Sequence, residues 1–91
     1  MEQTRHRKQI DPRTLASTMR AIGLSFAARL RQKGPGISVT THEILGIVTE
    51  EVRELEAAVH AGDPDKVHAE LVDLAVACAL GIASIQTGVE W

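Results

Sequence analysis

The chain has 91 residues, enough for one domain that buries only roughly 60–70% of its unfolded surface. Its net charge of −2 argues against an electrostatic nucleic-acid binder, and no apolar run approaches the ~18 residues of a membrane span. The N-terminus is too polar for a signal peptide, and the single cysteine, Cys78, fits a reducing compartment. We therefore expect a cytoplasmic protein that binds neither nucleic acid nor a membrane. Aromatic residues make up only 2% of the chain, which favours packed helices over a β-sandwich.

The first predicted helix covers residues 12–33 and follows a flexible N-terminus, residues 1–11. Asp11 can cap it, Pro12 suits its first position, and the Gly-Pro-Gly stretch at 34–36 ends it. Apolar residues recur along it at spacings of three and four, as in an amphipathic helix. They are Leu15, Met19, Ile22, Phe26 and Leu30.

Two further helices are predicted. Thr40 and Glu43 form a capping-box pattern at the start of a helix over residues 41–61, which Gly62 ends. Asp63-Pro64 begins the third helix, and Gly88 ends it. Each helix has an apolar stripe: Leu45, Val48, Val52, Leu55 and Val59 on the second, and Val67, Leu71, Leu74, Cys78, Ile82 and Ile85 on the third. We expect Gly81 to allow close helix packing, and Cys78 to be an inert core residue.

These elements predict an all-α fold in which the second and third helices form an antiparallel hairpin and the first helix packs across it. Residues 12–91 would form a single domain. The two apolar stripes would pack against each other. A domain this small leaves apolar surface uncovered, so we expect oligomerisation to complete a four-helix-type bundle.

The same acidic pattern occurs on both hairpin helices, as E-V-R-E-L at residues 51–55 and E-L-V-D-L at residues 70–74. With about 100° between successive residues, the acidic pair of the second helix lies about 60° and 120° around the helix from Val48, and the pair of the third helix lies at the same angles from Val67. We therefore expect four carboxylates at the margin of the helix contact: Glu51, Glu54, Glu70 and Asp73. Anions held together there repel, and oxygen ligands of this kind suit Mg²⁺, Mn²⁺ or Ca²⁺. The alternative is a set of solvated surface residues.

The acidic segments read together are E-E-V-R-E at residues 50–54 and E-L-V-D at residues 70–73. This two-part motif resembles that of the MazG-like all-α nucleotide pyrophosphohydrolases, a superfamily that includes the dimeric dUTPases. The resemblance implies Mg²⁺-dependent cleavage of a nucleoside triphosphate to the monophosphate and pyrophosphate by a homodimer or homotetramer, with Mn²⁺ as a substitute. By motif position it implies that Glu50 and Glu51 are catalytic. It implies four metal ligands: Glu51, Glu54, Glu70 and Asp73.

The sequence departs from this family after the second motif, because no Lys or Arg follows Lys66. Phosphate contacts must then come from elsewhere. We expect Arg29 and Lys33, with Arg31 as a further candidate, to bind substrate, or a partner subunit to contribute. The alternative for these cations is a solvated helix C-terminus, which the helix dipole favours. Phe26 and Trp91 are candidates for stacking on a base, although Phe26 also fits the core.

Two functions remain open from the sequence. The first is a nucleoside triphosphate pyrophosphohydrolase that removes unwanted nucleotides from the cellular pool. The second is a non-catalytic helical oligomerisation or nucleotide-binding module, in which the acidic cluster is a structural metal site. The two differ in whether the acidic residues are required for turnover.

Overall fold

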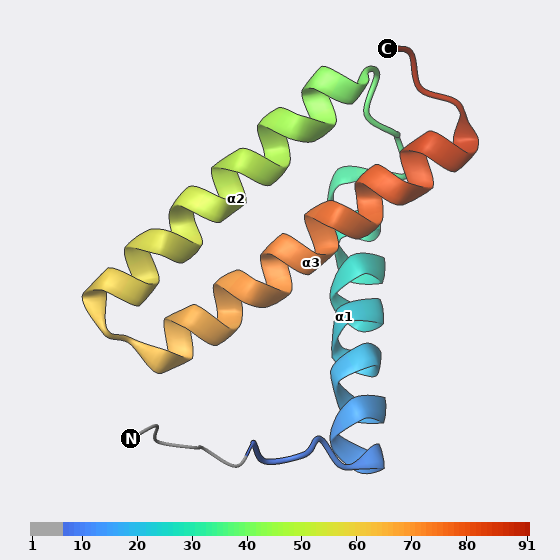
Figure 1. Cartoon of the computed structure of the whole chain (residues 1–91). Helices are drawn as coiled ribbons and strands as arrows, with labels where there is room; N and C mark the ends of the chain where they lie inside the picture. The colour runs from blue at the N-terminus through green and yellow to red at the C-terminus, as the bar shows by residue number, and fades with distance from the viewer. Residues whose placement is uncertain (1–6) are drawn as a thin grey trace.

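The structure is a computed structural model of the chain that describes residues 7–91, so it describes only the last five residues of the predicted flexible N-terminus. It forms three α-helices: α1 (Pro12–Lys33), α2 (Thr41–Ala61) and α3 (Pro64–Thr87) (Figure 1). The all-α class is therefore confirmed, and so are the bounds predicted for the first two helices. Residues 7–11 are exposed and precede the first helix.

The helix ends form as the sequence signals indicate. Asp11, Thr40 and Asp63 are the N-caps, and each side chain accepts a hydrogen bond from a backbone N–H three residues later, at 2.9–3.1 Å. Gly62 ends α2 in the left-handed conformation, with φ of 69°, which a residue with a side chain rarely adopts. The Glu43 side chain accepts from the backbone N–H of Val39, one residue before the N-cap that a capping box would use.

α2 and α3 form the predicted antiparallel hairpin, and small residues line the contact between them (Figure 1). Ala58 of α2 and Ala77 of α3 are almost fully buried. A Cβ atom added to Gly81 would lie 2.8 Å from the Cγ2 atom of Ile44, closer than carbon atoms pack. The expectation that Gly81 allows close packing is therefore confirmed.

The expectation that the two apolar stripes pack against each other holds for only part of each stripe. Val48 and Leu55 of α2 and Val67 and Leu74 of α3 are half-buried. Leu45 is 66% exposed and Val59 is 55% exposed, whereas Ala58, about 100° around α2 from Val59, is 1% exposed. On α3, Ile82 is 60% exposed and Cys78 is exposed as well, so Cys78 is not a core residue. The helices meet along their small residues because these permit close approach, and the larger aliphatic side chains are turned outward.

α1 packs against α3, and α3 crosses in front of it in Figure 1. Only the C-terminal half of the predicted α1 stripe is covered: Phe26 and Leu30 are half-buried, whereas Leu15 and Met19 are 57% and 59% exposed. The N-terminal half of α1 extends past the hairpin, which contributes to an elongated shape of 52 × 28 × 24 Å.

The segment between α1 and α2 is attached to the end of α3. The fully buried hydroxyl of Ser84 accepts a hydrogen bond from the backbone N–H of Ser38 at 3.1 Å and donates to the carbonyl of Leu80 at 2.7 Å. Glu90 pairs its backbone with residues 39–41 in a short parallel bridge. These bonds fix the position at which α2 begins relative to α3.

α3 is long and apolar enough to cross a membrane by length and composition, with a mean hydropathy of 1.6 over its most apolar window. About 28% of that window is buried inside the protein. The core helix of a soluble protein passes the same test.

Candidate metal and phosphate site

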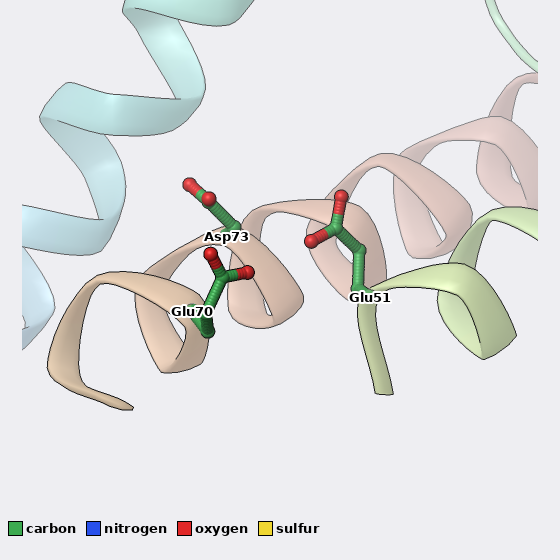
Figure 2. Close-up of side chains that lie close together, drawn as sticks. All are labelled: Glu51, Glu70 and Asp73. Carbon is green, nitrogen blue, oxygen red and sulfur yellow. The ribbon is translucent and has the colours of Figure 1, made fainter. Parts of the chain in front are cut away.

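Three carboxylates of the hairpin lie close together. Glu51 comes from α2, and Glu70 and Asp73 come from α3 (Figure 2). One oxygen of each residue lies within 4.8 Å of the corresponding oxygens of the other two. Glu51 and Glu70 are half-buried, and Asp73 is exposed. Three of the four predicted ligands therefore form one cluster.

The hairpin geometry explains why these positions meet. In an antiparallel hairpin, residues at equal distances from the turn lie at the same height, and this turn is centred on Gly62 and Asp63. Glu51 and Asp73 lie about eleven residues from its centre, and Glu54 and Glu70 about eight. The two acidic pairs lie at matching distances from the turn and therefore form one group of carboxylates.

Two of the carboxylates come from positions close to the hairpin contact. Glu51 lies about 20° around α2 from the buried Ala58, and Glu70 lies about 20° around α3 from the buried Ala77. Both side chains are half-buried, and Glu51 also lines the cavity beside α1. Their closeness to the contact follows from its rotation toward the small residues of the two helices.

The acidic cluster is electrostatically strained. Burial, followed by the charges of Glu54 and Asp73, raises the pKa of Glu51 above its usual value of 4.5. Burial, followed by Glu54 and Asp73, also raises the pKa of Glu70, against a smaller opposite effect of Lys66. Glu54 is therefore a neighbour of both groups, although it lies outside the closest trio.

Two oxygens of this cluster have no hydrogen-bond partner among residues 7–91. Oε2 of Glu51 and Oε2 of Glu70 are both buried, and neither accepts a hydrogen bond from the described residues. Buried anionic oxygens without donors are unfavourable, and a divalent cation would satisfy them. The donor set contains only carboxylate oxygens, which suits Mg²⁺ or Mn²⁺ better than zinc. The residues present therefore fit such a cation.

A cavity of about 500 Å³ lies between α1 and the hairpin, beside this cluster. Its acidic wall contains Glu50, Glu51 and Asp73, and α1 contributes Arg29 and Lys33. The remaining lining residues are Ser25, Ala28, Gln32, Ile47 and Val76. A volume of this size is typical of small-molecule sites. The structure thus brings the predicted substrate-binding cations and the predicted acidic residues to one cavity.

Arg29 and Lys33 share the cavity because residues four apart lie on the same face of a helix. Arg31, the third cationic candidate, is exposed and does not line it. Glu50 lies at the cavity wall but outside the closest carboxylate trio, so its predicted place beside the ligands agrees with the geometry.

Two polar residues of this cavity, Ser25 and Gln32, were missed by the sequence reasoning. Their spacing from Arg29 could have indicated that they line the same cavity, because both lie within about one turn of Arg29 on the same side of α1. The two aromatic candidates for base stacking do not line the cavity: Phe26 is half-buried, and Trp91 is 91% exposed.

No protein-family model matches the chain, and comparisons with curated proteins and with solved structures likewise find no match.

Proposed function

We propose that this protein is a Mg²⁺-dependent nucleoside triphosphate pyrophosphohydrolase that releases the monophosphate and pyrophosphate. The observation that carries the proposal is the cavity in which Glu51 and Asp73 lie together with Arg29 and Lys33. An acidic cluster suited to a divalent cation, next to two cations, matches the needs of a polyphosphate substrate. The resemblance of residues 50–54 and 70–73 to the MazG-like motif supports the same reaction.

In this proposal Glu51, Glu54, Glu70 and Asp73 hold the cation. When bound, Mg²⁺ neutralises phosphate charge and makes a coordinated water a better nucleophile. Mn²⁺ has similar ligand preferences and would replace it. The exposed side of Asp73 leaves this cluster open toward the cavity, where phosphate oxygens would approach.

The remaining residues of the cavity position the reactants. Arg29 and Lys33 bind phosphate oxygens, the guanidinium through paired N–H donors and the ammonium as a point charge. Glu50 orients the attacking water and accepts its proton, as the α–β anhydride bond breaks and pyrophosphate leaves. Ser25 and Gln32 offer a hydroxyl and an amide for contacts to the sugar or base.

We place this activity in the cytoplasm, in a protein that binds neither membrane nor nucleic acid, and assign it to the removal of unwanted nucleotides. α3 then serves as the core helix of a soluble protein. Its acidic residues Glu70 and Asp73 support this assignment, because carboxylates are costly within a bilayer.

The test is pyrophosphate release from a panel of ribo- and deoxyribonucleoside triphosphates, with Mg²⁺ and with EDTA. We expect Mg²⁺-dependent release that Glu51→Gln lowers by roughly 100-fold or more, since it removes a ligand and a charge. Glu56→Gln is the matched control, because Glu56 is exposed on α2 and belongs to neither the cluster nor the cavity. Absence of release from every triphosphate by the folded protein would overturn the proposal.

A second candidate is a non-catalytic oligomerisation or nucleotide-binding module with a structural metal site. The outward-turned apolar stripes favour it, since they provide a surface for association without any catalytic role. In that case Glu54→Gln would change neither helicity nor assembly, and no turnover would exist to lose. Under the first proposal, Glu54→Gln retains helical circular dichroism and loses hydrolysis.

A further inference from the structure

The side of α1 that faces away from the hairpin is open to solvent, and α1 extends past its crossing with α3 (Figure 1). Gly23 is at the centre of this side, because it lies about 160° around the helix from Ala21 and from Ser25, which line cavities toward the hairpin. Leu15 and Met19 lie on one border and are 57% and 59% exposed. We call this side the outer face of α1; in order around the helix it contains Leu15, Met19, Gly23, Ala16, Arg20 and Arg13.

The centre of the outer face is flat. No atom of residues 7–91 lies within 4 Å of a Cβ atom added to Gly23, whereas one added to Gly81 would lie 2.8 Å from Ile44. Glycine lowers the stability of a helix interior, and packing within the chain gives no reason for it at this position. Ala16, its neighbour on the outer face, is exposed as well. Small residues between larger side chains allow a second helix to approach closely, as Gly81 does in the hairpin.

The charges of the chain are divided unevenly between α1 and the hairpin. Residues 7–33 contain seven Lys or Arg and a single acidic residue, Asp11, whose side chain caps α1. Residues 34–91 contain two Lys or Arg and ten Asp or Glu. An extended anionic surface, such as a bilayer or a nucleic-acid duplex, would be attracted by the first region and repelled by the second. A narrow acidic partner that contacts α1 alone avoids this repulsion.

Arginines form a row along the second border of the outer face. Arg13 and Arg20 are seven residues apart and Arg31 follows eleven residues later, so all three lie within about 20° around the helix. The successive distances along the helix axis are roughly 10 and 16 Å. All three side chains are exposed. Carboxylates with the same spacing on another helix can face the whole row when the two helices lie side by side.

We propose that the outer face of α1 binds an acidic amphipathic helix of a different protein. One border of that helix has the carboxylates that face Arg13 and Arg20, and the other has aliphatic or aromatic side chains that cover Leu15 and Met19. The α1 helix of a second copy offers no such carboxylates, because its single acidic residue, Asp11, is the cap. The inference does not rest on the proposed activity, since no residue of the outer face lines the cavity beside the acidic cluster.

Fluorescence anisotropy of a labelled peptide tests this inference on the full chain. The probe is a helical peptide of about three heptads, with Glu at the spacing of the arginine row on one border and Leu on the other. We expect saturable binding that weakens as salt is added, and an affinity lower by roughly 10-fold or more for Arg20→Glu. Arg53→Glu is the matched control, because Arg53 is exposed on α2, and it should bind as the unmodified protein does. Absence of binding, or an equal loss in both variants, would overturn the inference.

A second variant separates a helix contact from attraction between charges alone. Gly23→Leu keeps every charge and meets no atom of residues 7–91 within 4 Å of its Cβ, so the fold is retained, but it prevents close approach of the peptide. We expect it to lower the affinity by roughly 10-fold. Gly46→Leu, at an equally open position of α2, is the matched control and should have no effect.

Three outcomes of these measurements would refute docking of an acidic helix. The first is an unchanged affinity for Gly23→Leu. The second is tighter binding of phosphatidylserine vesicles or of a DNA duplex than of the peptide. The third is a lower mass of the protein in solution for Gly23→Leu, which would assign the outer face to a second copy of the chain.

Discussion

The two sides of the α2–α3 hairpin differ in chemistry although the same two helices build them. The side toward α1 has half-buried carboxylates, two buried oxygens that accept no hydrogen bond from residues 7–91, and a cavity to which α1 contributes Arg29 and Lys33. The other side has large aliphatic residues open to solvent, among them Leu45, Val59 and Ile82. Each helix thus has an acidic face beside the cavity and an aliphatic face open to solvent. The narrow contact between them is left to small residues such as Ala77 and Gly81, which allow the carboxylates of both helices to meet.

Removing a cation from the cavity wall tests most strongly whether the two sides of the hairpin act separately. We expect Arg29→Gln to lower kcat/KM for pyrophosphate release by roughly 10- to 100-fold, because a phosphate loses a paired, charge-assisted contact. The mass of the protein in solution should stay the same, since Arg29 lies on α1, away from the exposed aliphatic residues Leu45 and Ile82 of the hairpin. Steady-state kinetics and light scattering on the same sample check both statements.

The control for this variant is Arg53→Gln, which changes the charge equally on an exposed position of α2 outside the cavity. Its kcat/KM should remain near that of the unmodified protein. If both variants lost activity to the same degree, the effect would be one of overall charge, and Arg29 would have no specific role.

Sequence reasoning succeeded where local chemistry decides. The caps at Asp11, Thr40 and Asp63 indicated the helix starts. The repeated acidic pattern indicated that carboxylates of the two hairpin helices would lie together, as Glu51, Glu70 and Asp73 do. These features depend on residues a few positions apart and on a two-residue turn. Little long-range information is needed to predict them.

Sequence reasoning failed on which helix faces meet. Apolar periodicity identifies the most hydrophobic direction of a helix, and the stripe containing Leu45 was therefore assigned to the hairpin contact. The actual contact uses Ala58, Ala77 and Gly81, which contribute little to such a pattern but permit close approach. A stripe that stays open to solvent and a stripe that enters the core look the same in one sequence. The small residues were the available signal for telling them apart.

The contact between α2 and α3 can be tested at Gly81. We expect Gly81→Ala to lower the free energy of unfolding by about 1–2 kcal/mol, because overpacking against Ile44 outweighs the gain in helix propensity. Gly46→Ala is the matched control, since nothing lies within 4 Å of its added Cβ, and it should raise stability by up to about 1 kcal/mol. Urea unfolding measures both.

Removing the Ile44 methyl group that would clash shows whether this contact causes the destabilisation. In an Ile44→Ala background the Cγ2 atom is gone, so Gly81→Ala should become neutral or stabilising. A destabilisation of the same size in both backgrounds would show that Gly81 matters for another reason than its contact with Ile44.

The smallest expected effect is the dependence of stability on pH in the absence of divalent cations. The pKa of Glu51 is raised in the folded protein from its usual 4.5, mainly by burial and then by neighbouring carboxylates. The folded state therefore holds a proton that the unfolded state releases, and this contribution to stability is complete below about 4.5 and lost as pH rises through the raised pKa. Glu70 acts in the same direction.

We therefore expect unfolding of the metal-free protein to become easier as the pH rises above about 4.5, relative to Glu51→Gln, which has no proton to lose at this position. Added Mg²⁺ should reverse this loss at neutral pH and have less effect at lower pH, where protons compete for the same oxygens. Thermal unfolding of both proteins at several pH values, with Mg²⁺ and with EDTA, measures the difference. Parallel pH curves for the two proteins would show that the carboxylates of the cluster are well solvated, and the electrostatic case for a cation between α2 and α3 would then fail.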